Sequence, residues 1–488
     1  MRDLVGRLFK MVIGYGAIQW AGPFLSLIFT PIITRFLDPS DYGIADYVTT
    51  IIAAVSAIAM VSMPVAILTH FNDRPEDMPW RRAITGSALT FAVISGVAFG
   101  AAIFSAAPYI AERVTFLIPY VPILRFIGVT FALGLTAPIL IICAQAALRV
   151  RWGMVFSAVA IIGTIVGNVL FIVVLQLGAT GMLLTPILVS TSVTIAALIM
   201  MRRLIGRPQS GITQMLLRAG VILLPSVIAT WTMQMSDRLF LATTVTTTAL
   251  GYYAIAGKMA SLVFVVIGPI TNSWTPLTMA VQNEEDAQER YVSLSRYLIA
   301  AVMLVSLGVG LFANEILIVL TRPAYLPASP YVGYLTLTYV FTVFGFILST
   351  GALMGKQLSS VSGAAVVAAV VNLTLNAIMI PVWGVWGAVW ATVLSYGIHQ
   401  IILYAILLRR HPVPYPVGRI LAALVLLVAL ITVGLWVPPI CFPYRVGIKL
   451  IIYAMLPLGL ILVRLIQPQE VHQLLMAIRA GRRSLHAA

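Results

Sequence analysis

Residues 117–148 read LIPYVPILRFIGVTFALGLTAPILIICAQAAL, and Arg125 is the one charged side chain among them. About 20 consecutive apolar residues are enough for a helix to cross the hydrocarbon core of a bilayer, so this stretch predicts a membrane span. The whole chain of 488 residues is 61% hydrophobic and 9% charged, which is too little charge to cover the surface of a water-soluble protein. We therefore expect an all-α integral membrane protein, because each helix satisfies its own backbone hydrogen bonds in lipid.

Similar apolar stretches recur along the chain, separated by charged residues or by Pro and Gly, and they predict fourteen transmembrane helices. The predicted helices cover residues 11–34, 43–69, 83–107, 117–148, 153–175, 179–201, 219–243, 250–280, 295–320, 329–354, 360–380, 386–408, 419–439 and 446–466. The first is longer than the apolar core of a signal peptide and lacks a small-residue cleavage site, so we interpret it as a span.

The 30 Lys and Arg residues are concentrated in alternate connections between the predicted spans. Because basic residues are retained on the cytoplasmic side, this bias and an even number of spans place both termini in the cytoplasm. The bias also accounts for the net charge of +15 without a nucleic-acid partner, since the inner leaflet is anionic. Residues 467–488 combine an apolar stripe with several Arg residues and predict an amphipathic cytoplasmic tail on that membrane surface.

Two similar halves flank an Arg-containing segment at 202–218. In the first half, Pro23 and Arg35 are followed by Tyr42-Gly43-Ile44-Ala45; in the second, Pro225 and Arg238 are followed by Gly251-Tyr252-Tyr253-Ala254 at nearly the same spacing. Six helices per half give both halves the same orientation, with a cavity expected between them. The predicted organisation is an N-lobe at 1–201, a cytoplasmic linker at 202–218, a C-lobe at 219–408, two further helices at 409–466 and the tail at 467–488.

The repeated motifs also carry a family resemblance. PIITRFLDPSDYG at 31–43, SDRL at 236–239 and GYYAIAGK at 251–258 resemble the polysaccharide-precursor (O-antigen or exopolysaccharide, Wzx-type) flippases of the MATE-like MOP exporter superfamily. The resemblance extends over the whole chain, including two helices after a twelve-helix core. It implies a V-shaped bundle of two six-helix lobes in the bacterial inner membrane.

The resemblance also implies a transporter rather than an enzyme. It would move an undecaprenyl-diphosphate-linked oligosaccharide from the inner to the outer leaflet by alternating access, for lipopolysaccharide or exopolysaccharide biosynthesis. Its other partners would be membrane lipids, a polysaccharide polymerase and a chain-length regulator. No cofactor or metal is expected, and the two cysteines of the chain argue against a thiolate metal site.

Such a cargo needs a wet, cationic path, because sugars and a diphosphate lose their hydration in hydrocarbon at a cost of many kcal/mol. Basic residues within or beside predicted spans are therefore candidate diphosphate ligands: Arg35, Arg125, Arg238 and Lys258. Arg suits phosphate because its planar guanidinium binds two oxygens at once. The structural alternatives are that Arg35 reaches the lipid headgroups and that Arg238 pairs with an acid on a neighbouring helix.

Uncharged polar and aromatic residues are candidates for lining the cavity and contacting sugars. Trp231 and Gln234 share a helical face with Arg238 and predict a stripe facing the lumen. The further candidates are Asn168, Asn372, Asn376 and Tyr396. Polar side chains also hold membrane helices together, and for Asn372 and Asn376 this structural role is favoured.

Asp46, Asp237 and His399 are candidates for coupling transport to a H⁺ or Na⁺ gradient, with the membrane potential as an alternative driving force. For Asp46, stabilisation of a helix amino terminus and pairing with a lumen cation rank before coupling. Asp38-Pro39-Ser40-Asp41 reads as a helix start with Asp38 as N-cap.

Three other functions stay open. A lipid II flippase would share fourteen spans and a cationic cavity. A MATE-type cation or drug antiporter would place acids in its lumen, whereas here basic residues outnumber acids within the spans. A multi-span polymerase or glycosyltransferase acting on the same carrier lipid would need a larger outer loop or an acidic motif than the sequence offers.

Overall fold

The computed structural model describes residues 21–74, 76–147, 150–281, 287–354, 358–408, 415–438 and 441–466, which form helices joined by short connections with no strand among them. Within these ranges, 13 helical segments are long and apolar enough to cross a bilayer, so the predicted all-α membrane class is confirmed. Residues 11–20 of the predicted first span, 11–34, and the whole predicted tail, 467–488, lie outside the described residues, while the rest of that span forms part of α2.

Long helices and short helical turns follow one another along the chain. In order, they are α2 (Ala21–Phe36), α3 (Pro39–Met60), α4 (Met63–His70), α5 (Met78–Arg113), the 3₁₀ helix η1 (Thr115–Tyr120), α6 (Val121–Ala146), α7 (Val150–Asn168), the π-helix η2 (Val169–Val174), α8 (Gly178–Met201), α9 (Ser210–Met235), α10 (Asp237–Thr244), α11 (Thr247–Ala260), α12 (Leu262–Val281), α13 (Ala287–Leu311), α14 (Ala313–Leu320), the 3₁₀ helix η3 (Pro323–Ala328), α15 (Ser329–Leu335), α16 (Leu337–Met354), α17 (Leu358–Trp383), α18 (Val385–Leu408), α19 (Val417–Leu435) and α20 (Phe442–Leu462).

Several predicted spans are interrupted rather than continuous. The span predicted at 43–69 breaks between α3 and α4, where Val61 and Ser62 adopt left-handed conformations with φ of 45° and 51°. Pro64 follows in the first turn of α4, the position at which proline's missing N–H costs no helical hydrogen bond. The start of α3 agrees with the predicted motif, since Asp38 is its N-cap and Pro39 its first residue, although the Asp38 side chain makes no capping hydrogen bond.

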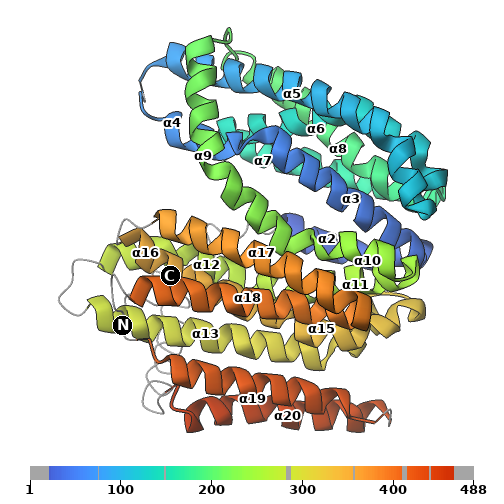
Figure 1. Ribbon diagram of the computed structural model, residues 1–488, viewed down its shortest axis with the longest axis vertical. Coiled ribbons are helices and arrows are strands. Elements are labelled where there is room, and N and C mark those ends of the chain that lie inside the picture. Colours follow the sequence, from blue (N-terminus) through green and yellow to red (C-terminus); the bar gives the residue numbers. More distant parts are fainter. Residues whose placement is uncertain are drawn as a thin grey trace, which may run out of the picture. The chain divides into compact units, whose positions relative to one another are not determined.

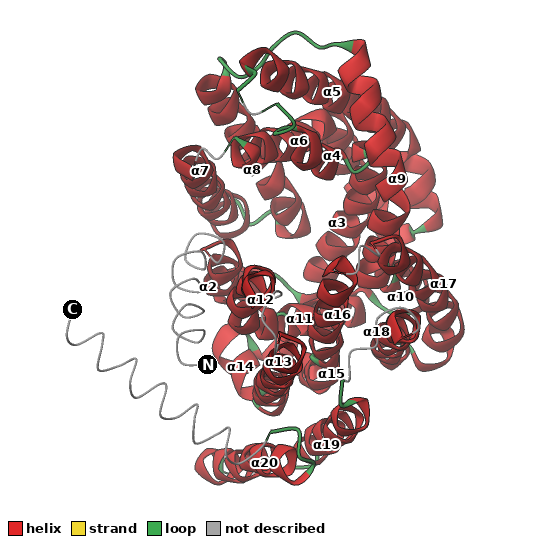
Figure 2. Cartoon of the chain, turned by 90° about the vertical axis from the view of Figure 1, so that its left-hand side faces the viewer, coloured by secondary structure: helices red, strands yellow, loops and turns green. Residues whose placement is uncertain are grey.

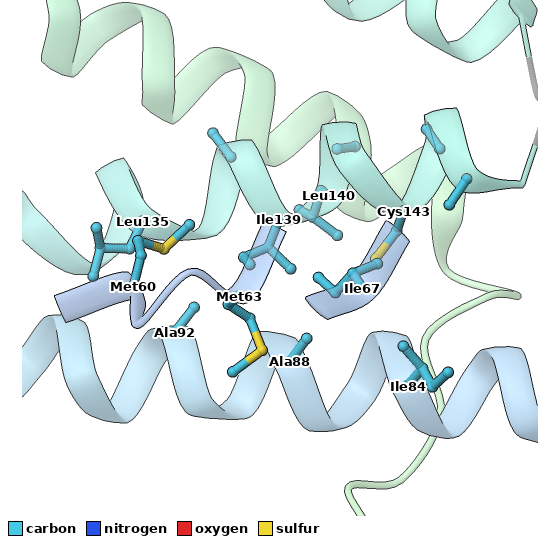
Figure 3. Packing of buried hydrophobic residues seen from close by; sticks show 14 of the residues in the cluster. Met60, Met63, Ile67, Ile84, Ala88, Ala92, Leu135, Ile139, Leu140 and Cys143 are labelled. Atoms are coloured by element: carbon cyan, nitrogen blue, oxygen red, sulfur yellow. The ribbon is translucent and has the colours of Figure 1, made fainter. Parts of the chain in front are cut away.

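The chain forms two compact units. The N-terminal unit comprises Leu25–Ala254 and Ala369–Ala388. Within it α5, α6 and α8 run alongside one another (Figure 1). The side chains of Met63 and Ile67 on α4 lie between Ala88 on α5 and Ile139 and Cys143 on α6 (Figure 3), and all five are fully buried. Small residues at such contacts let helix backbones approach closely, which is how helices associate in lipid.

Among the described residues, the C-terminal unit comprises those within 21–24, 255–368 and 389–466. Here α19 and α20 form a hairpin whose helices lie side by side (Figure 2) and pack on α13. Glu315 on α14 pairs with Arg445 Nε at 2.9 Å and Lys449 Nζ at 2.7 Å, and both basic residues belong to α20. Tyr415, in the connection before α19, packs against other aromatic rings, and burial raises its pKa.

Candidate functional site

The side chain of Arg238 is the centre of an ion-pair network in the N-terminal unit. Its Nε donates to Oδ2 of Asp46 on α3 at 2.6 Å, and one terminal nitrogen donates to Oδ1 of Asp237 at 3.1 Å. The same nitrogen donates to the backbone carbonyl of Gln234 at 3.1 Å. The Tyr253 ring on α11 lies 5.5 Å from the guanidinium, within range of a cation–π interaction. We call Asp46, Asp237, Arg238 and Tyr253 the Arg238 cluster.

A break in the predicted seventh span positions two members of the cluster. The helix predicted at 219–243 ends as α9 at Met235 and restarts as α10 at Asp237, with Ser236 between. Asp237 thus occupies the first turn of α10, where a negative charge is favourable. Its carboxylate accepts the backbone N–H of Arg238 at 2.8 Å and the hydroxyl hydrogen of Tyr253, so this acid, only 2% exposed, is fully held in place.

Two glycines bring α3 and α11 together and so determine where Asp46 lies. A Cβ on Gly43 would lie 2.5 Å from the carbonyl oxygen of Thr247 and 2.6 Å from the backbone nitrogen of Gly251, and a Cβ on Gly251 would clash with the carbonyl oxygen of Pro39. Only glycine permits this approach. Gly43 and Gly251 belong to the two repeated motifs, so the structure joins the motifs that the sequence places in different halves.

The net charge of the Arg238 cluster differs from that of an isolated cation. One guanidinium faces two carboxylates, which gives one negative charge when both acids are ionised. The Arg238 side chain is 12% exposed and that of Asp46 is 25% exposed, compared with 2% for Asp237. Asp46 is therefore the partner on another helix that solvent or a ligand can reach. A guanidinium whose carboxylate partner is within reach of solvent can exchange that partner for another anion.

Ser236, two residues before Arg238, belongs to a cluster of uncharged polar side chains. Ser236 donates to Oδ1 of Asn372 at 3.0 Å, and Nδ2 of Asn376 donates to Ser236 Oγ at 3.2 Å and to Asn372 Oδ1 at 3.1 Å. All three residues are buried, and Oδ1 of Asn376 has no hydrogen-bond partner. These contacts connect α17 to the junction of α9 and α10, as the favoured structural interpretation of the two Asn residues requires.

The other predicted cations lie outside the Arg238 cluster. Arg35 is exposed in the last turn of α2. Arg125 is exposed on α6, with its guanidinium 5.3 Å from the ring of Phe104. Lys258 is half-buried on α11, in the part of that helix that belongs to the C-terminal unit. Their roles in binding a diphosphate stay predictions.

The predicted lining residues occupy varied environments. Gln234 is exposed, whereas Trp231 is half-buried with an indole N–H that has no hydrogen-bond partner. Asn168 is buried where α7 passes into the π-helix η2, an irregularity that is frequent at functional sites. In the C-terminal unit, Tyr396 is half-buried on α18, and Nδ1 of His399 lies 3.2 Å from Nε2 of Gln400.

Ser236 and Tyr253 were not among the predicted site residues. Both lie within motifs that carry the family resemblance, and that was the only signal for them in the sequence. Their hydrogen bonds to Asn372 and Asp237 depend on the break at Ser236, which hydropathy does not reveal.

The fold is one that several solved transporters also have. The structure is similar to the lipid II flippase MurJ in an inward closed conformation, with a TM-score of 0.66 and 14% identity over 91% of this chain and 98% of that chain. It is also similar to an inward-facing multidrug resistance MATE family transporter, with a TM-score of 0.61 and 16% identity over 79% and 93% of the chains. A MOP superfamily transporter from Pyrococcus furiosus matches with a TM-score of 0.55 and 17% identity over 83% and 95%.

The amino-acid sequence supports a narrower assignment. Residues 32–330 match the model of a polysaccharide biosynthesis protein family, and the chain belongs to that family. None of the curated proteins matches the sequence significantly. Family and fold together support a membrane flippase and confirm the predicted relationship to the polysaccharide-precursor exporters of the MOP superfamily.

Proposed function

We propose that this protein flips an undecaprenyl-diphosphate-linked oligosaccharide from the inner to the outer leaflet of the cytoplasmic membrane. The family is one of polysaccharide biosynthesis, and a similar fold occurs in a flippase for a lipid-linked precursor, lipid II. The observation that carries the proposal is the ion pair between Arg238 and Asp46, which connects two helices and is partly open to solvent.

The proposed step is an exchange of anions at Arg238. When no cargo is bound, Asp46 occupies the Nε side of the guanidinium, while Asp237 pairs with a terminal nitrogen. Two oxygens of a diphosphate offer the guanidinium a bidentate partner of higher charge, so binding cargo displaces Asp46 and loosens α3 from α10. Asp237 and Tyr253 keep the guanidinium oriented throughout.

Asp46 also provides a coupling step in this proposal. Once displaced, its carboxylate has lost its cation and is free to bind a proton or a sodium ion from the gradient. The ion then leaves when Arg238 returns to Asp46 after the cargo is released. This links each cycle to an ion gradient without a cofactor.

The second candidate is exchange of an organic cation for protons, as in a MATE-type antiporter. The observation that favours it is the excess of carboxylate over guanidinium in the Arg238 cluster. In that case the cation would bind Asp46, and Arg238 would be the group displaced.

Transport by reconstituted protein separates the two candidates. Proteoliposomes containing the full chain should translocate a fluorescent diphosphate-linked saccharide and leave ethidium in place. Arg238→Gln should abolish translocation, while Arg113→Gln, at an exposed basic residue that ends α5, should keep it. Ethidium transport that survives Arg238→Gln but not Asp46→Asn would support the antiporter instead.

A further inference from the structure

A basic pocket of about 610 Å³ lies at one end of the helices of the N-terminal unit. The residues that line it come from the start of α5, the end of α6, the start of α7 and the end of α8, and they are Met78, Arg81, Arg82, Ala147, Trp152, Met200, Arg203 and Leu204. The bias in basic residues predicts that this end faces the cytoplasm. The pocket is therefore expected at the boundary between the inner leaflet and water.

The charges of the pocket are all positive, because the described lining contains three arginines and no acid. The closest acid along the chain, Asp77, is engaged as the N-cap of α5, where it accepts the backbone N–H of Trp80 at 3.0 Å. Three guanidinium groups around one cavity repel one another unless an anion lies between them. The pocket therefore favours an anionic ligand.

Two of the three arginines, Arg81 and Arg82, are held in position by hydrogen bonds before any ligand binds. Arg81 donates to Oδ1 of Asn72 at 2.9 Å, and Asn72 in turn donates to the carbonyl oxygen of Ala146 at the end of α6. Arg82 donates from Nε to the carbonyl oxygen of Arg203 at 2.7 Å. The buried Nε of Arg81 has no hydrogen-bond partner among the residues that the structure describes. Flexible surface arginines that only mark the cytoplasmic side would not need this anchoring, which lowers the entropy lost on binding.

The apolar part of the lining indicates a lipid. Trp152 is half-buried at the start of α7, and indole rings prefer the headgroup level of a bilayer. Met78 and Met200 add flexible apolar surface, which suits the glycerol and first methylenes of an acyl chain. A free inorganic anion would gain nothing from these three side chains.

We propose that this pocket binds the phosphate headgroup of an anionic glycerophospholipid from the adjacent leaflet. Basic pockets between helices on the cytoplasmic side bind such headgroups by charge and hydrogen bonding. The lipid would connect the ends of α5 and α8, which already meet through the hydrogen bond between Arg82 and Arg203. The pocket is a second lipid site, separate from the Arg238 cluster that we assign to the cargo.

The test uses native mass spectrometry of the purified full-length protein with phosphatidylglycerol and, for comparison, phosphatidylcholine. Wild type should retain phosphatidylglycerol selectively. Arg203→Gln removes a pocket guanidinium and keeps the backbone carbonyl that anchors Arg82, so it should weaken phosphatidylglycerol binding about tenfold or more. The matched controls, Arg202→Gln and Arg207→Gln, neutralise exposed arginines outside the pocket lining and should bind as wild type does.

Three results would overturn the proposal. Equal losses of phosphatidylglycerol binding in Arg203→Gln and in the controls would mean that the lipid is attracted by the overall charge of the surface and not by this pocket. Displacement of phosphatidylglycerol by inorganic phosphate at equal concentration would mean that the site takes a free anion. Tighter binding of farnesyl diphosphate than of phosphatidylglycerol, lost in Arg203→Gln, would make the pocket an entry site for cargo.

A measurement on the wild-type protein covers the case in which Arg203→Gln does not fold. Phosphatidylglycerol carrying a photoreactive group near its headgroup should label peptides that contain Met78, Trp152 or Met200. Labelling confined to other helices would contradict the proposed site.

Discussion

Arg238 and Asp46 lie 192 positions apart in the sequence and 2.6 Å apart in the structure, where a guanidinium nitrogen of one donates to a carboxylate oxygen of the other. The pair is the only direct ion pair that connects α3 with α10 among the described residues. If the proposed exchange of anions occurs, this contact forms and breaks once in each transport cycle.

The strength of the pair can be measured with a double-mutant cycle. Asp46→Asn and Arg238→Gln should each destabilise the protein, and the double variant should lose about 1–3 kcal/mol less than the sum of the two single variants. The reason is that the second substitution removes a charge that the first has already left without its partner. Unfolding of the purified protein in mixed micelles measures the three free energies, and strict additivity would show that the two charges do not interact.

Asp46→Asn should also change how transport depends on the ion gradient. The amide lacks the carboxylate's charge for binding a proton or a sodium ion, so flipping by the variant should become insensitive to an imposed pH or sodium gradient, whereas wild type responds to one of them. Initial rates in proteoliposomes with and without the gradient measure this. An identical response in variant and wild type would make the role of Asp46 structural.

Loss of cations should stop translocation without unfolding the protein. The double variant Arg238→Gln/Lys258→Gln should abolish flipping and still reach the membrane in normal amounts, because both residues are proposed to neutralise the diphosphate. Arg238→Lys should restore little activity, since an ammonium group cannot bind two oxygens in one plane. Surface polysaccharide in a strain that depends on this protein provides the measurement, and normal polysaccharide in the double variant would remove both residues from the mechanism.

The glycine contact between α3 and α11 predicts a steric effect. Gly251→Ala places a methyl group against the carbonyl oxygen of Pro39 and should destabilise the protein by about 1–3 kcal/mol. Gly134→Ala is the matched control, because a methyl group at Gly134 on α6 meets no atom within 4 Å. Thermal unfolding compares the two, and equal melting temperatures would mean that the helices separate without cost.

The polar cluster at Ser236 predicts a buried hydrogen-bond defect. Ser236→Ala leaves Oδ1 of Asn372 without the donated hydroxyl hydrogen and should cost about 1–3 kcal/mol. Thr230→Ala removes an exposed hydroxyl that bonds only within α9, and it should change stability by less than about 0.5 kcal/mol. Similar stabilities of the two variants, together with loss of flipping in Ser236→Ala, would indicate that Ser236 contacts the cargo instead.

Hydropathy was sufficient to predict the class and most of the spans, because a bilayer imposes one length and one composition on every crossing helix. The breaks at Val61–Ser62 and Ser236 could not be predicted in this way, since hydropathy averaged over a whole span does not show where a helix is interrupted. The motifs in the two halves correctly indicated related segments, but their direct contact through Gly43 and Gly251 depends on tertiary packing.

The residues of the Arg238 cluster were predictable to a similar degree as the membrane spans. Arg238, Asp46 and Asp237 stood out because ionisable groups in membrane helices need partners. The sequence left three roles open for Asp46. Choosing among them required knowing that Arg238, which is far along the chain, lies beside it. Tyr253 gave no comparable signal, because an aromatic residue in an apolar helix is ordinary and its hydroxyl partner lies on another element.

The shared carboxylate of Glu315 has a practical consequence for measuring motion. Because Arg445 and Lys449 both pair with it, and α13 packs along both helices of the hairpin, we expect α19 and α20 to move together with α13 and α14. Distances measured from a spin label at the exposed Tyr444 would then report the movement of the C-terminal unit as a whole. A change in such a distance during turnover would describe movement of that unit, and not separate movement of α19 and α20.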